Sequence, residues 1–384
     1  MKTFMGYERP DQTVGVRNYV AILPTVCCSN PVAEHIARNV PGSVALCHGH
    51  GCGRRPERQM HTDVIIGLGT NPNVFGTIVV SLGCEGINAA DVAEAIRKTG
   101  RPVELLIIQE QGSKKTTELG IKLAERMVAE AQKMQRREFP VSKLMLGLEC
   151  GGSDAMSGVT SNPAIGTLAD WLVEQNGTTV LTETTEFIGT SSILGKRACN
   201  EEIKCQVEEV IKNAQANTYE VLGKNAARAI SPGNMDGGMS TIQEKSLGCI
   251  RKGGTTQINE VVGYGEKPTK KGLVIMEGPG FDTESMTGMA AMGCQIIIFS
   301  TGRGNPIGFP IVPVIKVASN DNLYKRMQDD IDVNAGKLLG NYTFSDIQKE
   351  LIDLLIRVAD GAKTKAEQND QGGMVCIYAY SRSL

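Results

Sequence analysis

Apolar runs that end at a cysteine beside glycine are the feature that most constrains the fold of this chain. Three such runs lead into SVALCHGHGCG, TIVVSLGCEG and KLMLGLECGGSD, which carry Cys47, Cys84 and Cys150. Short apolar runs of this kind are typical of strands that are buried on both faces of a parallel sheet. Because open α/β sheets bind ligands at the carboxyl ends of their strands, the thiols are expected at a binding edge. Cys249, in EKSLGCIRKGG, is a less clear fourth case.

Strand-like and helix-like segments alternate along the chain, which predicts βαβ units with right-handed crossovers. Strands are expected at 19–23, 43–46, 77–82, 103–108, 143–148, 179–182, 273–276, 295–300 and 312–317. Helices are expected from about 32, and at 62–68, 89–98, 116–136, 162–174, 200–219 and 344–360. The segment 255–271 is polar and turn-rich.

A chain of 384 residues is too long for one ordinary core. Glu138-Phe139-Pro140 has the character of a boundary, which divides the chain into an N-terminal domain, 1–140, and a C-terminal domain, 141–384. The predicted fold class is α/β. Two domains with mainly parallel sheets, flanked by helices, face each other across a cleft, and the active site lies at the carboxyl ends of the strands.

Composition excludes several classes of partner. The net charge is −2, so no basic field attracts nucleic acid or anionic lipid. No apolar run approaches the roughly 20 residues of a membrane span, and the polar start of the chain shows no signal peptide. Eleven cysteines in a chain of this size are expected to be reduced thiols, some of them ligands. A cytoplasmic location is therefore expected.

The segment CHGHGCG, residues 47–53, holds two histidines and two cysteines, and His61 follows closely. Imidazole and thiolate suit borderline metals such as iron and zinc. The spacing of His48 and His50 does not fit one helix face, so a loop is expected, in which glycines allow close approach of a ligand. The simpler alternative is a glycine-rich turn whose histidines only form hydrogen bonds.

Two other motifs directly follow buried runs. In LGCEG, Cys84 and Glu85 could bind a metal or move a proton, although Cys84 could also be a small buried hydrophobe. In ECGGSD, Cys150 and Asp154 flank a turn whose N–H groups could hold an anion. The alternative for this second motif is a turn followed by a helix cap.

Charged residues also follow the later strands. Glu183 lies in LTETTEFIG, Lys252 in GCIRKGG and Arg303 in STGRGNPIG. A lysine could pair with a substrate carboxylate, and a guanidinium is suited to bidentate carboxylate binding. The alternatives are a solvated carboxylate, an ordinary lysine on a surface helix and a loop arginine.

Nine segments, taken in order, resemble the altronate and galactarate dehydratase family. They are GVRN, CHGHGCG, SLGCEG, IQEQGSKKT, LECGGSDAMSGVTSNPAIG, LTET, EKSLGCIRKGG, EGPG and FSTGRGNPIG. The resemblance covers nearly the whole chain, from about Gly6 to its end. It implies that a sugar acid loses water to give a 2-keto-3-deoxy acid, and that activity needs a divalent metal, typically Fe²⁺ or Mn²⁺.

The same resemblance bears on partners. Many members of the family carry a small N-terminal SAF domain, whereas this sequence begins directly at the large domain. It therefore resembles the large subunit of a split enzyme, with a separate small SAF-domain subunit as its partner. A symmetric homo-oligomer is the common default.

The chemistry of dehydration gives the candidate residues their expected roles. A weakly acidic proton beside a carboxylate must be removed, and positive charge must stabilise the resulting anion. The expected metal-side residues are Cys84, Cys150 and Cys249, with His48 or Cys52. His50 and Glu183 are expected to transfer protons. The expected substrate-binding residues are Ser153, Asp154, Lys252 and Arg303.

Three alternatives remain open. Several cysteines at strand ends would also allow an iron–sulfur cluster. A second reading is the large subunit of sulfolactate sulfo-lyase, which is similar in length and also lacks the small domain. That subunit is expected to lack the HGHGC thiols and the cysteine of LGC, and the presence of both here favours the sugar-acid branch. The third is a non-catalytic sugar-acid-binding subunit that regulates a partner.

Overall fold

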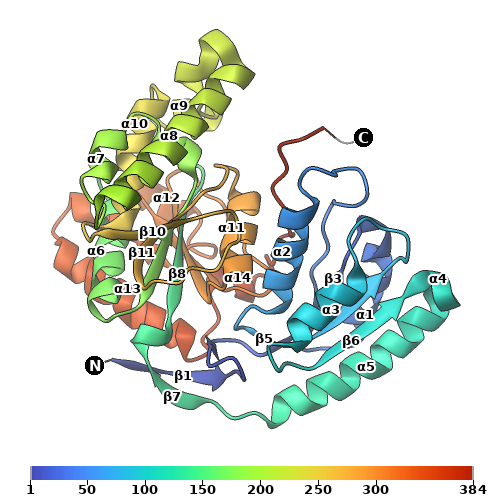
Figure 1. The fold of residues 1–384 in the computed structure, drawn as a ribbon. Helices are drawn as coiled ribbons and strands as arrows, with labels where there is room; N and C mark the ends of the chain where they lie inside the picture. The colour runs from blue at the N-terminus through green and yellow to red at the C-terminus, as the bar shows by residue number, and fades with distance from the viewer. Residues whose placement is uncertain (1, 383–384) are drawn as a thin grey trace.

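The computed structural model describes residues 2–382, and it places a four-stranded and a seven-stranded parallel sheet side by side (Figure 1). The smaller sheet has the strand order β4-β3-β5-β6. Its strands are β3 (Tyr19–Pro24), β4 (Ser43–Ala45), β5 (Val74–Ser81) and β6 (Val103–Ile107). All four were predicted to within a few residues.

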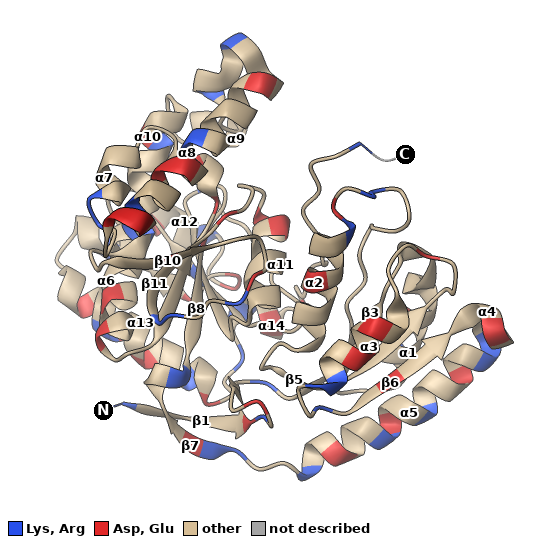
Figure 2. Cartoon of the chain, in the orientation of Figure 1, with Lys and Arg blue, Asp and Glu red and all other residues tan. Residues whose placement is uncertain are grey.

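Helices cover both faces of the smaller sheet. They are α1 (Asn30–Asn39), α2 (Arg58–Gly69), α3 (Ala89–Arg97), α4 (Ile108–Gln111) and α5 (Ser113–Lys133). Side chains of α1 and α5, such as Ile36 and Met127, pack with Ile22 and Ile78 of the sheet. Helices α2 and α3 contribute to a second core on the opposite face. The outer face of α5 carries interspersed charges of both signs (Figure 2).

The larger sheet has the order β10-β11-β9-β8-β12-β13-β14, and every neighbouring pair is parallel. Its strands are β8 (Met145–Cys150), β9 (Thr178–Leu181), β10 (Ile258–Val262), β11 (Gly272–Met276), β12 (Ile296–Thr301), β13 (Val314–Ala318) and β14 (Val333–Asn334). Strand β10 was missed because it lies in the polar segment 255–271, where its register shifts and only its two end residues are fully buried.

The helices of this half are α6 (Ser161–Glu174), α7 (Ser191–Gly195), α8 (Glu201–Leu222), α9 (Pro232–Asp236), α10 (Ile242–Cys249), α11 (Asp282–Met292), α12 (Asp321–Arg326), α13 (Phe344–Ala359) and α14 (Lys365–Gln368). Helices α6, α8 and α13 bury their apolar faces in one core with the sheet. Helix α11 was not predicted, because apolar and polar side chains alternate without helical periodicity along it. All of its residues except Asp282 and Glu284 are buried.

A third, small sheet is antiparallel and has the order β2-β1-β7. It consists of β1 (Thr3–Glu8), β2 (Val14–Gly15) and β7 (Arg137–Pro140). Strand β1 pairs with β7 from Thr3↔Pro140 to Gly6↔Arg137, so the start of the chain lies beside the predicted domain boundary. The sequence does not reveal this sheet, since β1 reads as polar and its partner is far along the chain.

The two parallel sheets are joined by a packed interface. Helix α2 lies against α11 so closely that a Cβ added to Gly67 would be 2.4 Å from the Ala291 carbonyl oxygen. Asn71 donates to the carbonyls of Ala290 and Cys294, at 2.7 and 3.0 Å. One apolar core continues from the α2 side of the smaller sheet to the α11 side of the larger one. The two sheets are therefore held in a fixed arrangement by close packing and hydrogen bonds.

No helix in the described part of the chain, residues 2–382, is both long enough and apolar enough to span a membrane.

Replacing Gly67 with alanine should force α2 away from α11. We expect the free energy of unfolding to fall by about 1–3 kcal/mol, the usual cost of inserting a methyl group into a packed contact. Urea unfolding followed by circular dichroism measures this change. Gly233→Ala is the matched control, because a Cβ at that helical position meets nothing within 4 Å. Equal stability of the two variants would contradict the packed interface.

Candidate active site

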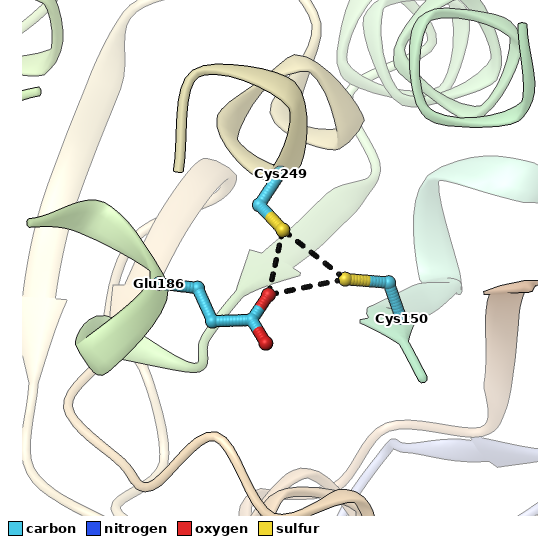
Figure 3. Close-up of side chains that lie close together, drawn as sticks. All are labelled: Cys150, Glu186 and Cys249. Atoms are coloured by element: carbon cyan, nitrogen blue, oxygen red, sulfur yellow. Dashed lines mark hydrogen bonds between the residues drawn. The ribbon is translucent and has the colours of Figure 1, made fainter. Parts of the chain in front are cut away.

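Two thiols and a carboxylate meet where the larger sheet ends. Cys150 is the last residue of β8, Cys249 is the last residue of α10, and Glu186 lies in the turn that follows β9. The three side chains point toward one another (Figure 3). The Sγ atoms of the cysteines are 3.3 Å apart, and they donate to Glu186 Oε2 from 3.2 Å (Cys150) and 2.6 Å (Cys249).

The local sequence explains how these groups reach one point. An apolar run carries β8 through the core, so its end delivers Cys150 to the carboxyl edge of the sheet, as predicted. The chain after β9 turns sharply at Glu183, whose φ of 67° is in the left-handed region. Such a backbone is unfavourable for a residue with a side chain, and it is common at functional sites. The turn places Glu183 and Glu186 on the same side as Cys150.

Lys252 and Glu183 form an ion pair with no exposure to solvent. Both side chains have 0% relative exposure, and the carboxylate oxygen that accepts from the Lys252 ammonium also accepts from the Cys150 N–H, at 3.1 Å. Burial, followed by the nearby Glu186 carboxylate, raises the pKa of Glu183 to about 7. Burial would lower the pKa of Lys252, but the surrounding thiols and carboxylates raise it well above its ordinary value.

A second ion pair connects Lys245 of α10 with Glu186. Burial alone would raise the pKa of Glu186, but the Lys245 and Lys252 ammonium groups outweigh it and hold that pKa below its usual value. The thiols show the opposite trend. The hydrogen bond with Cys249, followed by burial, raises the pKa of Cys150 well above its usual value. The site therefore presents neutral thiols beside an ionised carboxylate.

A cavity of about 470 Å³ opens at this cluster. Glu186, Lys245 and Asp282 line it, together with Gly151 and Gly152 of the turn after β8. A Cβ at Gly151 would lie 2.2 Å from Asp282 Oδ2, so only glycine fits at that position. A small anionic molecule in the cavity would meet the Lys245 ammonium group directly.

The donor set fits a divalent metal. One ligand atom from each of Cys150, Glu186 and Cys249 lies within 4.8 Å of the others, and all three residues are buried. Two thiols with a carboxylate suit borderline metals such as iron or zinc. Both thiols must lose their protons to bind a metal.

The remaining residues predicted for this half of the chain have different surroundings. Ser153 is buried, and its hydroxyl has no hydrogen-bond partner among residues 2–382. Asp154 accepts hydrogen bonds from Ser157, Ser319 and Asn320, which occupy both of its carboxylate oxygens. Arg303 is exposed in the turn after β12.

The residues predicted in the smaller half do not join the thiol cluster. His48 uses both ring nitrogens, because Nε2 bonds the Pro24 carbonyl at 2.9 Å and Nδ1 accepts from the His50 N–H at 3.2 Å. Cys52 and Cys84 are exposed, and Cys84 accepts from the Gln109 side chain. Within the described residues, no group of metal-ligating side chains includes His48, His50, Cys52 or Cys84.

His50 lies instead in a histidine pair beside Tyr378. Its ring centroid is 4.6 Å from that of His61, and His61 Nε2 bonds the Tyr378 carbonyl at 3.1 Å. Burial, followed by the charge of His61, lowers the pKa of His50 to about 4. Tyr378 lines a second cavity, of about 610 Å³, which shares Thr185 and Pro279 with the first.

Sequence reasoning did not select several charged residues of the site. They are Glu149, Glu186, Lys245, Asp282 and Lys316. Two of them carried a signal that could have been used, because Glu149 and Lys316 interrupt apolar strands and are fully buried. A charged residue inside a buried strand is rare unless it is paired or functional. Burial lowers the pKa of Lys316 to about 7, and its ammonium nitrogen lies 3.4 Å from the centre of the Phe299 ring.

Fold and site together define an α/β protein with a buried thiol–carboxylate centre at the ends of its strands. Residues 141–381 match the family model described as D-galactarate/Altronate dehydratase, C-terminal. Residues 6–132 match the model described as D-galactarate dehydratase/Altronate hydrolase, second domain. The chain belongs to the galactarate/altronate dehydratase family, as its sequence motifs suggested.

Individual relatives agree with this assignment. The chain is 36% identical to altronate dehydratase of Bacillus subtilis (strain 168), in an alignment that covers 96% of this chain and 76% of that protein. It is 35% identical to galactarate dehydratase (L-threo-forming) of Escherichia coli (strain K12), over 97% and 75% of the two chains. It is also 35% identical to (2R)-sulfolactate sulfo-lyase subunit beta of Chromohalobacter salexigens, over 95% of each chain.

Replacing Lys252 with methionine should leave the Glu183 carboxylate buried without its partner. We expect the unfolding free energy to fall by about 3–5 kcal/mol when Glu183 is ionised. Without the ammonium, the folded-state pKa of Glu183 rises further above its unfolded value. The loss should therefore be greater near pH 8 than near pH 5.5, where folded Glu183 keeps a proton.

Urea unfolding at the two pH values measures this effect. Lys204→Met, which removes an exposed partner of Glu201 on α8, is the matched control and should change stability little at either pH. A pH-independent loss in Lys252→Met would show that the lysine contributes through packing alone.

Proposed function

We propose that this protein is a metal-dependent sugar-acid dehydratase, which converts an aldonate or aldarate of the altronate or galactarate type to a 2-keto-3-deoxy acid and water. The observation that carries the proposal is the buried centre of Cys150, Glu186 and Cys249, which opens to a cavity with Lys245 on its wall. Family membership supplies the reaction class, and this centre supplies a place where that reaction could occur.

The residues of the cavity suit an anionic substrate. Loss of water from a sugar acid requires removal of a proton beside the carboxylate, which develops further negative charge on that group. Lys245 faces the cavity, and Lys252 lies behind it, so two ammonium groups are available to stabilise this charge. His50 and Glu183 remain our predictions for proton transfer. The pKa of about 7 supports Glu183, because it allows the group to exchange a proton near neutral pH.

The thiol–carboxylate donor set supports a divalent metal, and we propose Fe²⁺, with Mn²⁺ as the alternative. A bound cation would add positive charge beside the substrate carboxylate and polarise the departing hydroxyl. Cys150 and Cys249 stay in the predicted ligand set, and Glu186 joins them. Cys84, His48 and Cys52 remain predictions without support from the geometry. An iron–sulfur cluster would give a brown protein with visible absorption after anaerobic purification.

A second candidate function is sulfolactate sulfo-lyase activity. It is favoured by the relative named subunit beta, which this chain matches over 95% of its length. The same relative supports a separate small subunit as the partner, and a homo-oligomer in the cytoplasm remains a further prediction. A non-catalytic sugar-acid-binding subunit is the outcome expected if no substrate turns over.

A turnover screen tests the proposal. The anaerobically purified protein, loaded with Fe²⁺, is offered altronate, galactarate, glucarate, mannonate and sulfolactate, with and without a small SAF-domain partner. We expect a 2-keto-3-deoxy acid from one sugar acid. Release of sulfite would instead identify the sulfo-lyase function, and no turnover of any substrate with the partner present would leave the binding-subunit alternative.

Cys150→Ser and Cys249→Ser should each lower bound iron and turnover by roughly 100-fold or more, since even loss of a group that only orients a ligand costs 10–100-fold. Metal analysis by mass spectrometry accompanies the rate measurement. Cys205→Ser, an exposed cysteine of α8, is the control and should retain both properties. Cys84→Ser tests the predicted role of that thiol. Unchanged iron in both Cys150→Ser and Cys249→Ser would remove the thiols from the ligand set.

A further inference from the structure

Three carboxylates meet beside the thiol centre. Glu149 lies in β8, Glu183 follows β9 and Asp282 begins α11. One carboxylate oxygen from each lies within 4.8 Å of the others. Glu149 and Glu183 have no exposed surface, whereas Asp282 is partly exposed and lines the cavity of about 470 Å³. Three like charges at such distances in a buried site repel one another strongly unless something neutralises them.

Two of the oxygens in this cluster have no partner. Glu149 Oε1 and Glu183 Oε1 are buried and form no hydrogen bond with any described residue. The opposite oxygens are engaged, since Glu149 Oε2 accepts from Ser285 and Glu183 Oε2 from Lys252. Buried carboxylate oxygens without partners are costly. In each of these two carboxylates, Oε2 is therefore fixed by a hydrogen bond, and Oε1 is available to bind a ligand.

The local charges do not balance. Among the described residues, Lys252 is the one ammonium group that forms an ion pair with the cluster, and it serves Glu183. Lys316 is buried nearby, but its nitrogen has no hydrogen-bond partner among residues 2–382, and burial lowers its pKa to about 7. The missing positive charge corresponds to one divalent cation or to added protons.

We propose that Glu149, Glu183 and Asp282 form a second cation site, for a hard divalent ion of the Mg²⁺ or Mn²⁺ class. Carboxylate oxygens are the ligands these ions prefer, whereas the neighbouring thiols suit iron or zinc. Three protein oxygens leave further coordination positions for water or an anionic ligand. Because Asp282 is on the cavity wall, those positions face the same space as Lys245.

This inference goes beyond the proposed function, which requires a cation at the thiol centre alone. It also defines a condition for Glu183. A carboxylate ligates a cation only after it has lost its proton, so a filled carboxylate site and a proton held on Glu183 exclude one another. In the competing explanation, protons shared among the three carboxylates neutralise their charge and no cation binds. The experiment must distinguish this explanation from a bound cation.

Manganese titration of the chelator-treated, full-length protein tests the site, with free Mn²⁺ followed by its electron paramagnetic resonance signal. The double variant Cys150→Ser/Cys249→Ser should still bind one Mn²⁺ per chain. Glu149→Gln and Asp282→Asn should each weaken that binding at least roughly tenfold. Glu277→Gln, an exposed carboxylate on the wall of the second cavity, is the control and should bind as wild type does.

Cobalt separates this site from the thiol centre. The absorption of cobalt bound to thiolates should vanish in the double cysteine variant and persist in Glu149→Gln. Loss of metal from the thiol centre can therefore be observed separately from loss of metal from the carboxylate site. Thermal melting followed by circular dichroism shows whether each variant is folded. If Glu149→Gln does not fold, Asp282→Asn provides the test of Mn²⁺ binding, because a substitution at the partly exposed Asp282 disturbs the core less. Absence of Mn²⁺ binding to the double cysteine variant, or binding unchanged by Asp282→Asn, would overturn the second cation site.

Discussion

The buried ion pair between Lys252 and Glu183 is the interaction on which the rest of the site depends. One carboxylate oxygen of Glu183 binds both the Lys252 ammonium and the N–H of Cys150. It therefore connects the end of β8, the turn after β9 and the segment after α10. Two charges without solvent are favourable only when their geometry is well satisfied. The pair fixes the positions from which Cys150 and Cys249 reach each other.

The parallel sheet makes this pairing possible. Strands β8 and β9 are neighbours, so their carboxyl ends deliver Cys150 and Glu183 to adjacent positions on one edge. Helix α10 contributes Lys245 and Cys249, and the start of α11 contributes Asp282. No single segment contains the centre. Its geometry is set by packing of helices against a rigid sheet, which is the usual way for a fold to hold polar groups in place.

The sequence predicted most of the parallel strands and named four residues that lie together at the site, Cys150, Glu183, Cys249 and Lys252, because the signals were local. Cys150 and Glu183 stand at or just after the end of an apolar run, where a strand end is readable. Cys249 and Lys252 lie in the segment GCIRKGG at the end of α10. Glu186 lies in a short turn and Asp282 at a helix start, and their surroundings arise from contacts with residues far along the chain, Cys150 for Glu186 and Glu149 for Asp282. The β1–β7 pairing is of the same kind, since register between distant strands leaves no local pattern.

In the smaller half of the chain, a sequence segment with many potential metal ligands does not bring those ligands together. CHGHGCG is rich in potential ligands, yet both ring nitrogens of His48 bond the backbone, and the His50 ring lies against that of His61 in a tilted arrangement. His61 of α2 in turn bonds the carbonyl of Tyr378, which lines the second cavity. His61 thus links the two halves in the described structure, whereas the thiols and carboxylates of the larger half offer the donor atoms that suit a cation. The positive charge on the cavity wall comes from Lys245.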